Sequence, residues 1–86
     1  MKLKYRLIIK QIGDQYSAST SNFEEFNGVI FFSEVGKYIL EELEFGITKE
    51  ELMEKLISRY IGDKAEIEAE VDNFISTLTQ NGLLEF

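Results

Sequence analysis

The hydrophobic repeat of the chain changes once, near residue 33, from every second position to every third or fourth. Before that point Leu3, Tyr5, Leu7 and Ile9 alternate with mostly basic residues, a pattern typical of a strand with one buried face. After it, apolar residues recur as they do on one face of a helix. A single change of this kind predicts an α+β domain in which the strands come first.

A tight turn divides the amino-terminal part of the chain. The pair Gly13-Asp14 is typical of a hairpin turn, so we expect the strand that ends at Ile12 to be followed by a return strand from Gln15 to about Ser19. The two strands are then antiparallel neighbours.

A loop and a third strand are predicted after the hairpin. Residues 17–22 are small and polar, which predicts that the later part of this stretch is a loop, and Asn27-Gly28 is a second turn signal. Residues 29–32 are wholly apolar and do not alternate, which predicts a short strand with apolar cover on both faces, where sheet and helices meet.

Three amphipathic helices are predicted after residue 33, each with a capping residue before it and a glycine behind it. In chain order these residues are Ser33 and Gly46, Thr48 and Gly62, and Asp63 and Gly82. Thr48 and Glu51 have the spacing of a capping box. Residues 83–86 are expected to pack back on the core or to add a short strand. A three-stranded antiparallel sheet followed by three helices predicts one winged helix-turn-helix-like domain, residues 1–86.

Gly36 lies in the first turn of the first predicted helix, where glycine costs about 1 kcal/mol relative to alanine. We interpret it as a position that another backbone or an aromatic ring approaches closely. The corner between Ser33 and Gly36 is therefore predicted to be a constrained junction.

The side-chain inventory excludes most catalytic chemistry. The chain of 86 residues has no histidine and no cysteine, which excludes Ser/His and Cys/His nucleophiles, thiolate metal sites and disulfides. Two i, i+4 carboxylate pairs, Glu66 with Glu70 and Glu50 with Glu54, are interpreted as a solvated acidic face. We therefore expect no catalytic residue, no metal site and no cofactor, and a role in binding.

Charge is distributed unevenly. The first ten residues hold four of the nine bases and no acid, whereas the third predicted helix, residues 65–81, has four carboxylates and no base. Such a helix would repel phosphates, so we expect no nucleic-acid binding. The chain has no long uncharged apolar run, no signal peptide and no cysteine, and we expect a cytoplasmic protein that does not enter a membrane.

The stretch from Phe26 to Leu43, FNGVIFFSEVGKYILEEL, combines a short apolar strand, a polar cap, a glutamate and a glycine with an amphipathic helix. It resembles the signature of the PqqD-like family, the RiPP recognition elements. The resemblance continues through the second and third helices and spans roughly Tyr5 to Leu84. Residues 17–22 are more polar than the usual second strand of the family, and the aromatic residue common near Leu40 is absent.

The resemblance implies a non-catalytic adaptor. Such domains bind the leader segment of a ribosomally synthesised precursor peptide and deliver it to a modifying enzyme, frequently a radical SAM maturase. The leader pairs as an added strand with the third strand, in a groove walled by the third helix. By position, the backbone of Val29, Ile30, Phe31 and Phe32 becomes the pairing edge, and the chain is expected to be a monomer or a weak dimer.

The helix side of the groove follows from a helical projection. Ile75 lies on one flank of the apolar stripe, and Glu68, Asp72 and Thr79 lie beyond it. We take these four as groove residues and expect a basic leader residue near Glu68 or Asp72. The alternative, that Ile75 packs on a neighbouring helix, stays open.

Two other functions stay open. The chain could be a constitutive structural subunit of a maturase complex with no peptide of its own, or a winged-helix DNA-binding regulator. The acidic third helix argues against the regulator.

Overall fold

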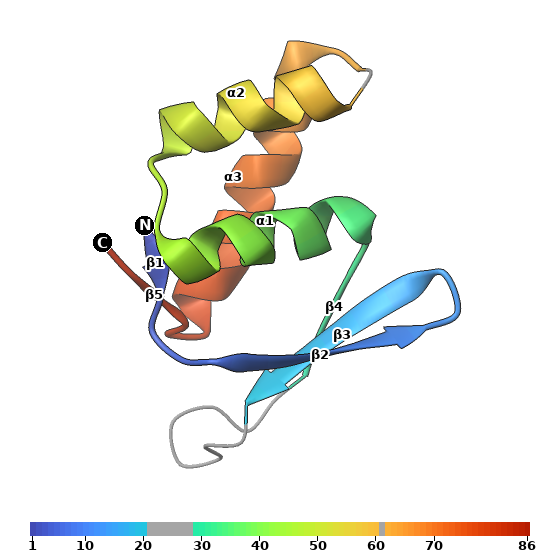
Figure 1. The fold of residues 1–86 in the computed structure, drawn as a ribbon, viewed down its shortest axis with the longest axis vertical. Helices are drawn as coiled ribbons and strands as arrows, with labels where there is room; N and C mark the ends of the chain where they lie inside the picture. Colours follow the sequence, from blue (N-terminus) through green and yellow to red (C-terminus); the bar gives the residue numbers. More distant parts are fainter. Residues whose placement is uncertain (21–28, 61) are drawn as a thin grey trace.

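The computed structural model describes residues 1–20, 29–60 and 62–86 and confirms the α+β, winged helix-turn-helix-like architecture (Figure 1). A three-stranded antiparallel sheet precedes three helices, and a two-stranded sheet joins the ends of the chain. The expected turn at Asn27-Gly28 lies outside the described residues. The elements are β1 Lys2–Leu3, β2 Leu7–Ile12, β3 Gln15–Thr20, β4 Ile30–Phe32, α1 Glu34–Phe45, α2 Lys49–Arg59, α3 Lys64–Gln80 and β5 Leu84–Glu85.

The predicted hairpin is present. Ile12 faces Gln15 across a two-residue turn in which Gly13 has φ +64°. Asp14 keeps a negative φ, and this combination is typical of a type II′ turn, whose twist matches that of the flanking strands. The turn therefore sets the register in which β2 and β3 pair.

The polar return strand is present where the sequence predicts it. β3 continues to Thr20 and lies in the middle of the sheet, between β2 and β4. Ser17, Ala18 and Thr20 are all buried, and residues 16–18 pair with β4 as well as with β2. Pairing with β2 along the whole of β3, and with β4 over residues 16–18, therefore outweighs the loop preference of these small residues.

The first predicted strand is divided in two. Its amino-terminal part, β1, pairs with β5 rather than with the hairpin, and Leu3 faces Leu84. The amino group of Met1 donates to the carbonyl of Ile47 at 2.9 Å, and the amide of Ile47 donates back to Met1 at 2.9 Å. The carboxyl-terminal residues thus form the short strand that was one of the two expectations, and the two chain ends lie side by side (Figure 1).

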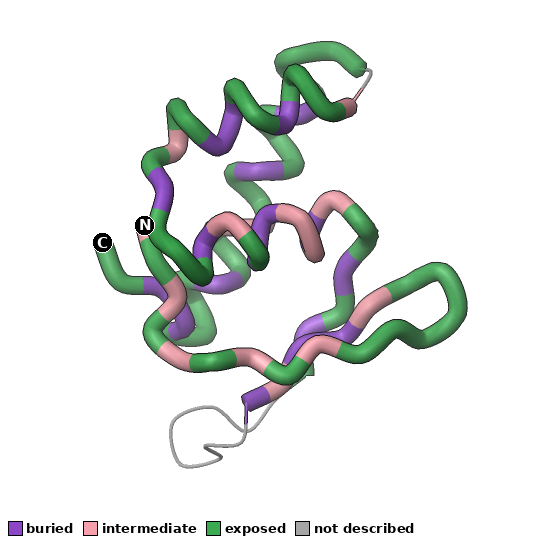
Figure 2. Tube along the Cα trace, viewed as in Figure 1, coloured by how far each residue is buried: buried purple, intermediate pink, exposed green. Residues whose placement is uncertain are grey.

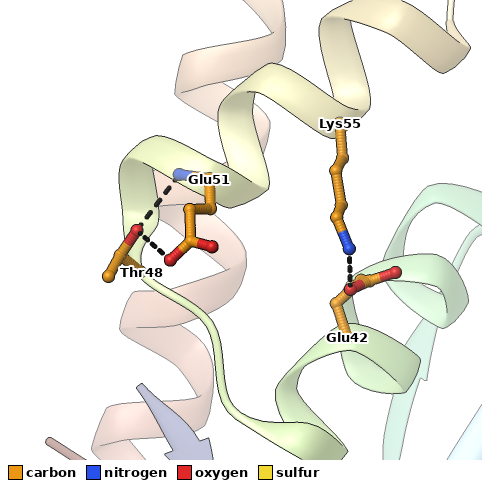
Figure 3. Close-up of polar contacts among 4 residues, drawn as sticks. All are labelled: Glu42, Thr48, Glu51 and Lys55. Carbon is orange, nitrogen blue, oxygen red and sulfur yellow. Dashed lines mark hydrogen bonds and ion pairs between the residues drawn. The ribbon is translucent and has the colours of Figure 1, made fainter.

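The helix starts follow the predicted caps. Thr48 Oγ1 accepts from the amide of Glu51 at 3.1 Å and donates to its carboxylate at 3.0 Å (Figure 3). Asp63 accepts from the amide of Ala65 at 3.0 Å, whereas Ser33 occupies the cap position of α1 without a side-chain bond. These caps satisfy amide groups that have no partner within the helix.

Buried aliphatic side chains from all three helices form the core (Figure 2). The most completely buried are Ile39, Leu40, Leu43, Leu52, Leu56, Val71, Leu78 and Leu83. At the surface, Lys55 of α2 and Glu42 of α1 form an ion pair at 2.9 Å (Figure 3). Among the described residues, no helix is both long and apolar enough to cross a membrane.

β4 is covered on one face only, so the expectation of apolar cover on both faces is wrong. Ile30 and Phe32 point into the core, whereas Phe31 is 64% exposed and Val29 before it is 55% exposed. The helices pack on the inner face of the sheet, and the side chain of Phe31 on the outer face stays largely exposed. The absence of alternation in this strand therefore reflects an exposed apolar face.

The close approach predicted at Gly36 is confirmed. A Cβ atom built on Gly36 would lie 2.8 Å from Cβ of Phe32 and 3.0 Å from Cδ2 of its ring. Real Cβ atoms do not approach other carbon atoms so closely, so the absent side chain lets the end of β4 lie directly against α1.

We expect Gly36→Ala to lower the free energy of unfolding by about 1–3 kcal/mol, because Phe32 must move to admit the methyl group. Urea denaturation followed by circular dichroism measures this change. Gly62→Ala is the matched control, since a Cβ there meets nothing closer than 3.9 Å, and it should be neutral or stabilising by up to about 1 kcal/mol. Equal stability of the two variants would contradict the contact.

Candidate peptide-binding groove

β4 has one open edge. It is the last strand in the order β2-β3-β4, and no strand among the described residues pairs with its other side. An edge of this kind carries backbone donors and acceptors that another chain can use. Two features decide what this edge can bind, namely which backbone groups point outward and what lies beside them.

The register predicts that Phe31 presents its backbone N–H and C=O at the open edge. The hairpin turn is closed by a hydrogen-bonded pair, Ile12 and Gln15, and the direction of the backbone groups alternates along each strand. Tyr16 therefore directs its groups toward β4, where it faces Phe32. Phe31, the next residue, is directed the opposite way, away from β3.

A hollow of about 240 Å³ lies between β4, the start of α1 and α3, and we call it the β4 groove. It is smaller than the roughly 300–1,000 Å³ of pockets that hold small molecules, and it suits one or two peptide side chains. The residues that line it are Phe31, Phe32, Ser33, Val35, Gly36, Ile39, Glu70, Asn73, Phe74 and Thr77.

Aromatic rings form the floor of the β4 groove. The Phe32 ring meets Phe74 of α3 edge to face, with centroids 5.8 Å apart, and stacks on Tyr16 of β3 at 6.1 Å. Both geometries are favourable for aromatic pairs. Because the missing side chain of Gly36 lets Phe32 lie against α1, the aromatic floor contacts the sheet and two helices.

The α3 wall of the groove consists of Glu70, Asn73, Phe74 and Thr77. Their spacing of i, i+3, i+4 and i+7 places them on one face of the helix. The hydroxyl of Thr77 donates to the Asn73 carbonyl at 3.0 Å, whereas the side chains of Glu70 and Asn73 have no hydrogen-bond or ion-pair partner among the described residues. These two polar groups are therefore available to a ligand.

The four helix residues predicted for the peptide site are not among the residues that line the β4 groove. Asp72 pairs with Lys49 of α2 at 2.7 Å, and this hydrogen bond raises the pKa of Lys49. Glu68 lies with Lys49 along a different hollow, between α2 and α3. Both carboxylates thus face α2 rather than β4.

The other two predicted helix residues have structural positions. Ile75 is half-buried and packs against the core, which was the alternative left open by the sequence. Thr79 donates its hydroxyl to the Ile75 carbonyl at 2.8 Å. The sequence argument placed the groove on the flank of the apolar stripe next to Ile75. In the structure, β4 lies beside the opposite flank, next to Phe74.

The residues that the sequence analysis missed had a weak signal. Glu70, Asn73 and Thr77 surround Phe74 at helical spacing, so an aromatic residue at one margin of the stripe has polar neighbours on its outer side. This pattern does not distinguish a groove wall from an ordinary solvated flank. In the described part of the chain, no three acidic side chains gather as metal ligands.

Fold and groove together define a small winged-helix domain in which an open strand edge lies beside a pocket of side-chain size. The family model described as coenzyme PQQ synthesis protein D (PqqD) matches residues 23–84, and the chain belongs to this family. Membership confirms the resemblance found in the sequence. No curated protein matches the chain.

A solved structure described as "TbiB1 in Complex with the TbiA(beta) Leader Peptide" has a similar fold. The TM-score is 0.74 at 24% sequence identity, and the match covers 99% of this chain and 95% of the other. At this identity the match establishes the fold. Nearly the whole chain therefore has the architecture of a protein that was solved with a leader peptide.

The contact between Phe32 and Phe74 should be measurable as a coupling energy. We expect the double-mutant cycle of Phe32→Leu and Phe74→Leu to give about 0.5–1.5 kcal/mol, because both rings contribute to one edge-to-face pair. Urea denaturation of the four proteins measures it. The control cycle pairs Phe32→Leu with Phe45→Leu, since Phe45 is 85% exposed. Equal coupling in both cycles would show that the aromatic floor is absent.

Proposed function

We propose that the chain, residues 1–86, is one peptide-binding domain that acts as an adaptor. It binds the leader segment of a ribosomally synthesised precursor peptide and presents the peptide to a modifying enzyme. The observation that carries the proposal is the open edge of β4 beside the β4 groove. Strand addition uses such an edge for backbone hydrogen bonds and a flanking pocket for side-chain selection.

Two comparisons support the proposal. The PqqD family model covers β4 and all three helices, and the TbiB1 structure, similar in fold, was solved with a leader peptide. In this proposal the leader pairs with Phe31, and its alternate side chains enter the β4 groove. The modifying enzyme is proposed to be a radical SAM maturase, and the chain is proposed to act in the cytoplasm as a monomer or a weak dimer.

Nucleic acid remains a poor candidate ligand. The four carboxylates of α3, at positions 66, 68, 70 and 72, are all exposed, and in a winged-helix protein this helix would have to approach phosphates. Repulsion between these groups opposes such a complex.

We expect Phe31→Pro to weaken leader binding at least about tenfold, because proline removes the N–H that the register directs to the open edge. Fluorescence anisotropy with labelled peptides measures it, using the leader segments of short reading frames that neighbour the gene. Phe31→Val keeps the N–H and is the matched control. Proline is tolerated where the N–H faces solvent, so the urea midpoint should change little.

Equal affinity of the proline and valine variants for a bound leader would contradict strand addition. The same measurement with Ile30→Pro is less informative, since the register directs the Ile30 amide to β3 and its loss would disrupt the sheet.

The constitutive-subunit alternative makes a different prediction. If the chain is an adaptor, size-exclusion chromatography of the chain with the neighbouring maturase should show a complex that also retains the precursor. The Phe31→Pro variant should then lose the precursor and keep the maturase. A maturase complex of unchanged composition, with no precursor bound by either protein, would favour the purely structural role.

A further inference from the structure

The charge that lines the β4 groove is negative. Among the described residues that line it, Glu70 alone is charged, and its carboxylate has no ion-pair partner in the described part of the chain. The cations of the nearby helices lie elsewhere. Lys37 of α1 pairs with Glu41 at 3.5 Å and lies over the Tyr16 ring, 5.4 Å from its centroid. Lys49 of α2 pairs with Asp72 at 2.7 Å, and Lys64 of α3 lines the hollow between α2 and α3. A ligand in this groove therefore meets one uncompensated negative charge.

A hydrogen-bond acceptor lies on the same face. Asn73 is three residues after Glu70, and its side-chain amide also has no partner among the described residues. A carboxylate and an amide oxygen can together accept from a donor-rich cation. Arginine is suited to such a site, because its guanidinium carries five N–H donors in a planar fork.

The apolar part of the groove suits the rest of such a side chain. Phe74 lies one helical turn after Glu70, is half-buried, and contributes its ring to the floor with Phe32. A cationic head over an aromatic ring is attracted to its face, and an aliphatic stem covers apolar surface. Acceptors at the rim and a ring at the floor thus match a long basic side chain better than a purely aliphatic one.

We propose that the peptide segment bound along β4 carries an arginine or lysine whose stem crosses Phe74 and whose charge lies against Glu70 and Asn73. This inference rests on the proposed function and specifies the chemistry of the peptide. It replaces the expectation that Glu68 or Asp72 attracts a basic residue, because those carboxylates face α2.

The test begins with a phage-displayed library of random dodecapeptides, selected on the full chain and sorted by loss of binding to Phe31→Pro. Clones that depend on Phe31 are the edge-binding set. We expect an arginine or lysine at one aligned position in this set. Selection on Glu70→Gln should remove the enrichment at that position.

Synthetic peptides from the edge-binding set then measure the contact. Glu70→Gln should weaken binding about two- to fivefold at low salt, as expected for an ion pair at an exposed rim. Citrulline in place of the peptide arginine should cause the same loss, and the two changes together should cause no further loss. Glu68→Gln, on the same helix but facing away from the groove, is the matched control and should change affinity less than twofold.

A charge exchange completes the test. A peptide with glutamate in place of arginine should bind Glu70→Lys more tightly than it binds the unchanged protein. All affinities for the basic peptide should fall with added salt, and those of Glu70→Gln should fall least.

The outcomes separate the two proposals. Edge-binding clones without an enriched basic position, or equal effects of Glu70→Gln and Glu68→Gln, would overturn the inference and leave leader binding by strand addition intact. A library in which no binding clone depends on Phe31 would overturn the strand-addition function, and the inference with it.

Discussion

The contact between Gly36 and Phe32 is the constraint on which the functional part of the structure depends. With no side chain at position 36, the end of β4 lies directly against the first turn of α1. Phe32 is then held between Tyr16 of the sheet and Phe74 of α3. The lack of a side chain at Gly36 thus allows the edge of β4, the start of α1 and the face of α3 to surround one hollow, which is the β4 groove.

The proposed function separates binding from chemistry. The chain has no histidine or cysteine, and its groove offers an open backbone edge, an aromatic floor and one uncompensated carboxylate. In the proposed function, these features select an extended peptide by its backbone and by the charge of one side chain. A domain built in this way can recognise a peptide while a partner enzyme supplies the reactive groups.

Features of local origin could be predicted from the sequence. The hairpin at Gly13, the capping residues Thr48 and Asp63 and the close approach at Gly36 were all predicted, because turn conformation and free helix ends depend on a few neighbouring residues. Features set by distant partners could not be predicted from the sequence. The first strand divides because β1 pairs with β5, at the other end of the chain, and one face of β4 is exposed because the helices pack on the other face.

By itself the sequence determined the order of strands and helices, the apolar stripe of α3 and the close approach at Gly36, since periodicity and backbone freedom are properties of the chain. Only the tertiary structure decided which flank of that stripe faces β4. Glu68 and Asp72 lie on one flank and Glu70 and Asn73 on the other, and a helical projection treats the two alike. The packing of α2 against the first flank, with Lys49 bound to Asp72, leaves the second flank to form the groove.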